Sequence, residues 1–276
     1  MLRVLCALLL LSGGCDACGG KPVARGADPD DEPIGALPVV AAPAVLEGVV
    51  RLAEGAALPS YAADQMFKKV LQQVDHAVLP DSCAPPKTTD RQPVQLTAEG
   101  LLAGMLVAAS DFSRQPQRPP MLHEVIIEDC RLTPRLVVAM KGDQLRVRNG
   151  VDYPFMPAYG DTPVVRTLIR GQTYDTTLEK ASVSPVLCGF TAPCGRADVV
   201  VMLHPVYVIS DAQGKFRFEN FPAGEEVKLS AWHPLFREVA IQVRVAPGET
   251  KRVELIATPL AAPPADPAPA TPAPTR

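Results

Sequence analysis

Cysteine is the residue type in this chain with the widest chemistry, because a thiol can form a disulfide, bind a soft metal or carry a lipid. Seven of the 276 residues are cysteine. Two of them, Cys6 and Cys15, belong to an N-terminal segment considered below. If the chain is exported to an oxidising compartment, the others are expected to form disulfides, although sequence alone leaves several pairings open. The favoured pairs are Cys83–Cys130 and Cys188–Cys194, with Cys18 left over.

The four histidines form no recognisable catalytic or ligand spacing. His204 precedes Pro205 and His233 follows Trp232, so the two could form a metal or ligand site if the fold brings them together. Structural histidines with hydrogen-bonded rings are the simpler interpretation. The chain also lacks a nucleophile elbow, an HExxH motif, a P-loop and a dinucleotide fingerprint. We therefore expect that the protein is not an enzyme.

The first 15 residues have the pattern of an export signal. Arg3 supplies a positive charge, residues 4–11 form a short apolar run, and small residues precede Cys15. Small residues directly before a cysteine resemble the lipobox of bacterial lipoproteins, although Leu11 lies one place further from Cys15 than is usual. An ordinary cleaved signal is the alternative. We predict a lipoprotein signal peptide at residues 1–14, lipidation of Cys15, and a protein anchored to a membrane of the bacterial cell envelope, facing the periplasm or the exterior.

Composition predicts a folded part between two unfolded flanks. Residues 15–43 are rich in proline, glycine and acidic side chains and are expected to be a flexible tether. Residues 259–276 are almost entirely Pro, Ala and Thr, which is typical of a disordered tail. The formal net charge is −3, and no basic stripe with interleaved aromatic residues occurs, so we expect no binding to nucleic acid.

Short β-strands dominate the pattern between tether and tail. Residues 215–218 and 227–232 alternate polar and apolar side chains, as half-buried strands do, and Gly214 closes a turn before the first of them. The segment 209–233 is therefore expected to be an antiparallel meander with its apolar face on a core. Similar runs elsewhere, and a single helix candidate at residues 62–74, predict a mainly β chain of the sandwich type.

Two stretches resemble known families. The first begins with a Cys-x3-Pro-Arg pattern at Cys130, continues through a Gly-Asp turn at residues 142–143 to Asn149, and is followed later by Cys188. It resembles the plastocyanin-like (cupredoxin) domains of bacterial exported proteins described as methylamine-utilisation-like. The second stretch, residues 207–233, resembles the carboxypeptidase-regulatory-like (transthyretin-like) module that follows in the same proteins.

The resemblance implies a domain order. Residues 44–203 are expected to form a cupredoxin-like β-sandwich, and residues 204–258 a small transthyretin-like (carboxypeptidase-regulatory-like) β-sandwich. Residues 44–53 could instead supply the first strand of the second module, which would make the cupredoxin-like part an insertion. The predicted fold is therefore mainly β, with two sandwiches flanked by a disordered tether and tail.

The resemblance also raises the question of copper, which the cupredoxin site of that family binds. A type-1 copper site needs two imidazoles and one thiolate, usually with a weak axial methionine. This chain departs from the pattern at the ligands, because Arg135 and Tyr153 stand where histidines are expected. We therefore expect that the fold is kept, that the copper site is lost and that no cofactor is bound. The weak metal candidates that remain are Cys188, Met156 and His204.

The loop at residues 153–159 occupies the rim where the family's metal would lie. Loops on a rigid sandwich often carry recognition, so this loop is the predicted exposed binding surface. Its candidate residues are Tyr153, Phe155, Met156 and Tyr159.

The leading hypothesis is a non-catalytic, lipid-anchored envelope protein that acts as a binding or structural β module with a degenerate copper site. Its expected partners are the membrane, through Cys15, and an envelope protein that the sequence does not identify. The alternative is a cupredoxin-like metal-binding or electron-transfer protein with an altered site, holding copper through Cys188.

Overall fold

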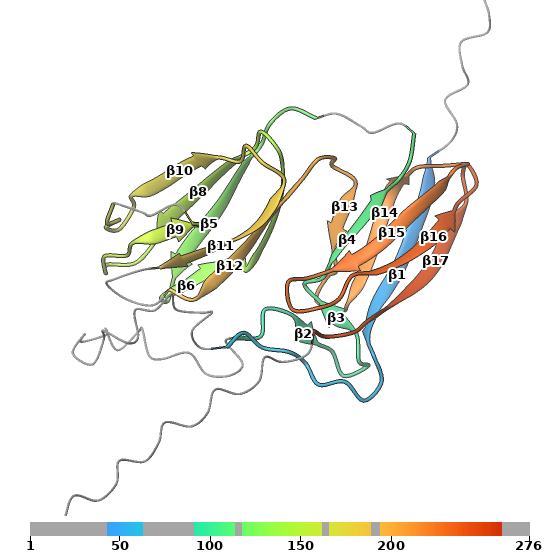
Figure 1. Ribbon diagram of the computed structural model, residues 1–276, viewed down its shortest axis with the longest axis horizontal. Coiled ribbons are helices and arrows are strands. Elements are labelled where there is room, and N and C mark those ends of the chain that lie inside the picture. The colour runs from blue at the N-terminus through green and yellow to red at the C-terminus, as the bar shows by residue number, and fades with distance from the viewer. Residues whose placement is uncertain (1–42, 63–90, 114–117, 162–165, 189–193, 261–276) are drawn as a thin grey trace, which may run out of the picture. The chain divides into compact units, whose positions relative to one another are not determined.

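The computed structural model describes residues 43–62, 91–113, 118–161, 166–188 and 194–260 (Figure 1). All of the secondary-structure elements in these ranges are β-strands, which confirms the expected mainly β class. Within the same ranges, no helix has the length and apolar character to cross a membrane. The expected signal peptide, the tether apart from its last residue, residues 63–74 of the expected helix, and the cysteines up to Cys83 lie outside the described residues.

The strands follow one another along the whole described chain. In order they are β1 (Ala44–Leu52), β2 (Gln95–Leu96), β3 (Leu102–Ala103), β4 (Leu106–Ser110), β5 (Leu122–Glu128), β6 (Arg131–Thr133), β7 (Leu136–Met140), β8 (Gln144–Asn149), β9 (Pro157–Tyr159), β10 (Thr173–Thr177), β11 (Ser182–Cys188), β12 (Arg196–Met202), β13 (Tyr207–Ile209), β14 (Lys215–Phe221), β15 (Glu226–Trp232), β16 (Val239–Arg244) and β17 (Thr250–Ala257).

Strands β5 to β12 build what we call the N-terminal sandwich. One sheet has the order β10-β8-β5-β6 and the other β7-β12-β11-β9. Two of the pairings, β5 with β8 and β7 with β12, are parallel. One apolar cluster contains residues of both sheets, including Val147 of β8 and Val199 of β12. In β8 apolar side chains are buried at alternate positions, as the sequence pattern predicts for a strand with one face on a core.

The C-terminal sandwich combines the end of the chain with two earlier strands. Its sheets have the orders β14-β1-β17 and β13-β4-β15-β16, and they share one apolar cluster. Strand β1 pairs along its length with β17, in parallel, and with β14. Strand β4 pairs with β13 and β15, whereas the expected domain boundaries placed this segment in the cupredoxin-like part. Alternation along β4 could not reveal this, because the pattern of a strand does not encode its partner.

The expected meander at residues 209–233 is wrong in its pairing. Consecutive strands there do not pair with one another, because β13 and β15 lie in one sheet while β14 lies in the opposite sheet. The turn itself is as predicted: Gly214 has a φ of 73° and donates its N–H to Asp211 O at 2.8 Å. A Cβ on Gly214 would lie 2.5 Å from that of Leu101, so only glycine fits. The segment therefore crosses between sheets while still burying its apolar face.

The first two residues of the expected tail belong to the C-terminal sandwich. Pro259 forms a β-bridge with Phe236, and the N–H of Leu260 donates to Leu235 O at 2.9 Å. These two residues of the predicted tail are therefore part of the fold, and residues 261–276 lie outside the described residues.

A third apolar cluster joins the two sandwiches. It includes Val138 and Val200 from the N-terminal sandwich and Leu106 and Trp232 from the C-terminal one. The hydroxyl of Tyr207, on β13, donates a hydrogen bond to Val138 O at 2.8 Å. The sandwiches thus meet through both apolar and polar contacts.

Candidate functional site

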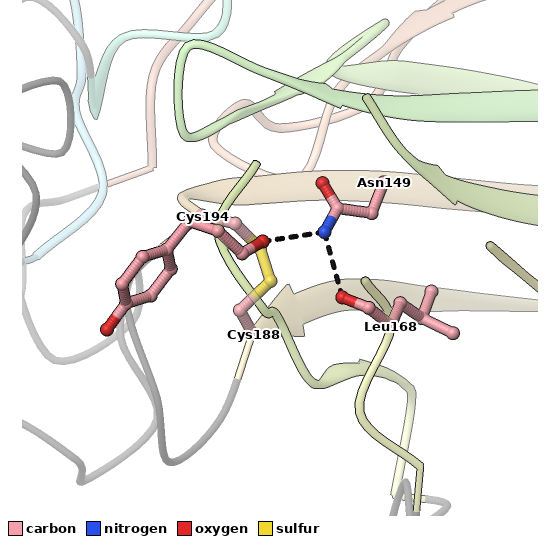
Figure 2. The surroundings of a disulfide bond; sticks show 5 residues. Asn149, Leu168, Cys188 and Cys194 are labelled. Atoms are coloured by element: carbon pink, nitrogen blue, oxygen red, sulfur yellow. Dashed lines mark hydrogen bonds between the residues drawn. A yellow bond between two sulfur atoms is a disulfide. The ribbon is translucent and has the colours of Figure 1, made fainter. Parts of the chain in front are cut away.

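Cys188 ends strand β11 and is joined to Cys194 by a disulfide, as predicted (Figure 2). The two Cα atoms lie 5.3 Å apart, within the usual range for such a bridge. Cys188 is 3% exposed and Cys194 is fully buried. The sulfur that the sequence resemblance assigns to a metal is therefore bonded to a second sulfur inside the core.

Asn149, at the end of β8, organises the chain beside this disulfide (Figure 2). Its side chain is fully buried, and Nδ2 donates to Tyr153 O at 2.7 Å and to Leu168 O at 2.8 Å. Its Oδ1 accepts from the N–H of Val151 at 2.9 Å. Both polar atoms of the amide are satisfied by backbone, so Asn149 fixes the path of two segments at this end of the sandwich.

The predicted binding loop at residues 153–159 is largely built into the sandwich. Phe155 is fully buried and exchanges two backbone hydrogen bonds with Leu168, so the expectation of an exposed side chain fails for this residue. The Tyr153 ring packs edge-on against it, with centroids 5.6 Å apart. The last three residues form β9, which pairs with β11 up to Cys188. Tyr153, Met156 and Tyr159 are half-buried.

The residues present do not fit a type-1 copper centre. Such a centre requires a thiolate, and the sulfur of Cys188 is held in a disulfide. Arg135 stands at one expected histidine position. Its Nη1 donates a hydrogen bond to the backbone oxygen of Gln92 at 3.1 Å. Among the described residues, no group of three His, Cys, Asp or Glu side chains is arranged to hold a metal ion.

Cys130 is also disulfide-bonded. It lies 7% exposed in the same core cluster as Cys188 and Cys194. Its predicted partner, Cys83, lies outside the described residues, so the Cys83–Cys130 pairing stays a prediction.

The two candidate histidines contact different aromatic rings. His204, the third metal candidate, packs edge-on against Phe112 with ring centroids 5.9 Å apart. His233 packs in the same way against Phe236 at 6.1 Å and is fully buried. Burial lowers the pKa of both rings. Each histidine therefore has its own apolar surroundings, which favours a structural role. The expectation of hydrogen-bonded rings holds only in part, because within the described residues His204 Nδ1 and His233 Nε2 are buried without a hydrogen-bond partner.

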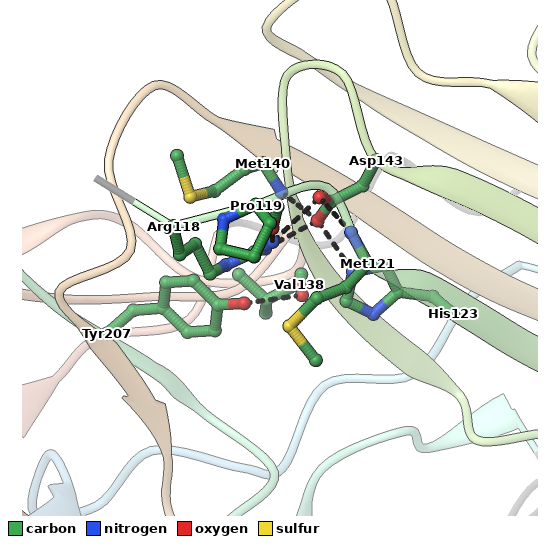
Figure 3. Close-up of polar contacts among 8 residues, drawn as sticks. All are labelled: Arg118, Pro119, Met121, His123, Val138, Met140, Asp143 and Tyr207. Carbon is green, nitrogen blue, oxygen red and sulfur yellow. Dashed lines mark hydrogen bonds and ion pairs between the residues drawn. The ribbon is translucent and has the colours of Figure 1, made fainter. Parts of the chain in front are cut away.

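A buried carboxylate that the sequence suggested only as part of a turn accepts five hydrogen bonds and ion-pair contacts in the N-terminal sandwich (Figure 3). Asp143 lies between β7 and β8 and is 1% exposed. Oδ1 accepts from Arg118 Nη1 at 2.8 Å and from the Met121 N–H at 2.9 Å. Oδ2 bonds to Arg118 Nη2 at 2.5 Å, to the Met140 N–H at 2.7 Å and to His123 Nε2 at 2.7 Å.

The electrostatics of Asp143 follow from these contacts. Burial alone would raise the pKa of its carboxyl, but the hydrogen bonds from Arg118 and from two backbone amides, with that of His123, outweigh burial and hold the pKa well below its usual range. Asp143 is therefore a carboxylate that stays charged to low pH and ties the start of β5 to the turn after β7.

A second buried carboxylate, Asp198 of β12, was also missed. Its Oδ2 accepts a hydrogen bond from the hydroxyl of Tyr61, and Oδ1 accepts from Arg196 Nε at 2.9 Å and Nη2 at 2.7 Å. The guanidinium of Arg196 also lies 4.2 Å from the centroid of the Tyr61 ring. Burial and the Asp198 carboxylate raise the pKa of Tyr61. The Arg-x-Asp spacing on one strand face was a signal in the sequence, but nothing local indicates Tyr61.

A cavity of about 860 Å³ lies over strands β1, β14 and β17. Its central carboxylate, Glu47, accepts from Arg252 Nε at 2.5 Å and from Arg217 Nη1. Because Glu47 is paired with both arginines, the charged groups of the lining do not indicate which class of ligand the cavity would bind.

No family model matches the chain, and no curated protein matches it. Similar solved structures include a purple cupredoxin from Nitrosopumilus maritimus, at 18% identity and a TM-score of 0.26 over 29% of this chain and 98% of that one. Amicyanin from Paracoccus versutus shows 20% identity and a TM-score of 0.25 over 32% of this chain and 85% of its own. The copper-containing nitrite reductase NirK from Thermus scotoductus SA-01 shows 15% identity and a TM-score of 0.27 over 36% of this chain and 26% of its own.

Proposed function

We propose that the chain is a non-catalytic, lipid-anchored protein of the bacterial envelope whose two β-sandwiches serve as a binding or structural module. In this proposal the N-terminal sandwich is cupredoxin-like in fold and has exchanged a metal thiolate for a structural disulfide. The C-terminal sandwich is the transthyretin-like (carboxypeptidase-regulatory-like) module.

One observation carries the proposal: the Cys188 sulfur is bonded to Cys194 in the core of the sandwich. A disulfide sulfur cannot act as the thiolate that type-1 copper requires. The neighbouring Asn149 amide is fully used by backbone carbonyls and an amide N–H. The residues at this end of the sandwich therefore support packing and not ligand exchange.

The envelope location is supported by the signal-like first 14 residues and by Cys15. Cysteine disulfides inside the folded part agree with export, because they persist in oxidising compartments.

Fractionation of cells that make the full chain tests the anchor. A Cys15→Ala variant is expected to leave the membrane fraction and to lose incorporation of labelled fatty acid, whereas the matched variant Cys18→Ala is expected to keep both. A Cys15→Ala protein that still sediments with membranes and carries label would contradict the anchor.

Metal analysis of the protein isolated from copper-supplemented cells is expected to find copper well below one ion per chain, and stoichiometric copper would favour the electron-transfer alternative.

A further inference from the structure

His233 is a buried ring with one unsatisfied polar atom. It directly follows β15 and is fully buried. Its Nδ1 accepts a hydrogen bond from the Leu235 N–H at 3.2 Å. The neutral ring must therefore carry its proton on Nε2. Within the described part of the chain, Nε2 is buried and has no hydrogen-bond partner.

The neighbours of His233 include Tyr61, which makes one of the contacts between the two sandwiches. Leu235, which donates to the ring, packs against Tyr61. Tyr61 in turn donates its hydroxyl hydrogen to Asp198 of β12 in the N-terminal sandwich. The Tyr61 backbone is held by Arg91, with Tyr61 N–H to Arg91 O at 2.9 Å and Arg91 Nη1 to Tyr61 O at 3.0 Å. We call the Tyr61–Asp198 hydrogen bond the latch. Leu235 is the residue that connects His233 to it.

The charges around His233 oppose a proton on its ring. Arg196 is the charged group that acts on it, and its positive charge disfavours an imidazolium. The carboxylate of Asp198 pairs with Arg196 and so partly offsets that charge, but burial, which is the larger effect, still opposes an imidazolium at His233. The closed arrangement therefore suits only the neutral ring.

We propose that His233 makes the Tyr61 latch sensitive to acid, so that protonation of the ring accompanies release of Tyr61 from the junction of the sandwiches. An open arrangement lets water solvate Nε2 and the imidazolium, while the closed one forces an unsolvated charge beside Arg196. Opening of the latch and proton uptake by His233 are then thermodynamically linked.

The direction and range of the effect follow from linkage. Burial, with the charge of Arg196, lowers the pKa of His233 to about 3. A solvated histidine has a pKa of about 6.5. The closed state keeps its full stability above that value and loses it progressively as pH falls toward 3. Between pH 7.5 and pH 5.0 the opening constant should rise about 30-fold, before most carboxylates titrate.

Two groups in the chain can be used to measure opening of the latch. Trp232 is the single tryptophan and lies in the apolar cluster shared by both sandwiches, so its emission should shift to longer wavelength on opening. The Tyr61 amide hydrogen is bonded to Arg91 O, so its exchange rate, corrected for intrinsic chemistry, measures the opening constant.

The experiment uses the mature chain with its disulfides intact, between pH 7.5 and 5.0. The native protein is expected to show the rise in Tyr61 exchange and a reversible Trp232 shift, and His233→Leu should flatten both. The matched variant His204→Leu removes a half-buried histidine ring that packs on Phe112 and should behave like the native protein. A His233→Leu profile that superimposes on the native one overturns the proposal.

A measurement on the unmodified protein guards against a variant that does not fold. Ring resonances of His233 should stay those of a neutral, Nε2-protonated imidazole while Trp232 emission is unchanged, and should become those of imidazolium as emission shifts. An imidazolium ring at His233 with unshifted Trp232 emission overturns the latch.

Discussion

The hydroxyl of Tyr61 donates a hydrogen bond to Asp198, and 137 residues of chain separate the two. Tyr61 follows β1, a strand of the C-terminal sandwich, whereas Asp198 lies on β12 of the N-terminal sandwich. Both side chains are almost fully buried. This hydrogen bond therefore fastens the segment that follows β1 of the C-terminal sandwich to strand β12 of the N-terminal sandwich.

Replacing Tyr61 by Phe should destabilise the protein by about 1–3 kcal/mol, because it leaves Asp198 Oδ2 buried without its donor. Urea unfolding followed by circular dichroism measures the change. The matched control, Tyr207→Phe, removes a hydroxyl that donates to the backbone at Val138, and its loss should cost about 0.5–1.5 kcal/mol. A Tyr61→Phe protein as stable as the native one would show that the contact contributes nothing.

Asp143→Asn should be among the most destabilising single changes in the N-terminal sandwich, at about 3–5 kcal/mol, because it leaves the buried end of Arg118 without its counter-charge. The exposed pair of Arg146 and Asp175 offers a control, and Asp175→Asn should change the unfolding midpoint little. Equal midpoints for the two variants would argue against the role given to Asp143.

Acid unfolding should reveal the same carboxylate. The pKa of Asp143 is lowered in the folded protein, so its contribution is fully present above its unfolded pKa of about 3.9 and disappears as pH falls through the lower folded value. The native protein should therefore lose stability steeply below pH 4, and Asp143→Asn should show a shallower loss over that range. Parallel pH profiles for the two proteins would contradict this assignment.

Phe155→Ala should cost about 3–5 kcal/mol, as expected for a fully buried aromatic side chain. Tyr159→Ala, in the same stretch but half-buried, should cost clearly less. Thermal unfolding of both variants measures the difference. A Phe155→Ala protein with native stability would restore the interpretation of residues 153–159 as a free binding loop.

Alternation and turn residues predicted individual strands well. The alternating run at residues 227–232 lies within β15, and the glycine turn before residue 215 closes as expected, because both depend on neighbouring residues. Pairing was not predictable in the same way. Strand β14 alternates as a meander strand would, yet it crosses to the opposite sheet, and β17 adds in parallel to β1 from the far end of the chain.

At the candidate site, too, contacts between residues close in sequence could be predicted, whereas contacts between distant residues could not. The disulfide of Cys188 and Cys194 joins residues six positions apart, and spacing was enough to favour it. The exposure of Phe155 was misjudged because its burial depends on a bridge to Leu168 across a loop. Tyr61 was missed because its partner, Asp198, is brought to it only by the packing of one sandwich on the other.

Copper titration of the purified mature protein, with the disulfide intact and again as a Cys194→Ala variant that frees the Cys188 thiol, tests the central claim most directly. Because the N-terminal sandwich lacks the two imidazoles that type-1 copper needs, neither protein should bind one copper per chain or develop the visible thiolate-to-copper charge-transfer band. Stoichiometric copper with that band in the native protein would contradict the account and assign the sandwich a redox role.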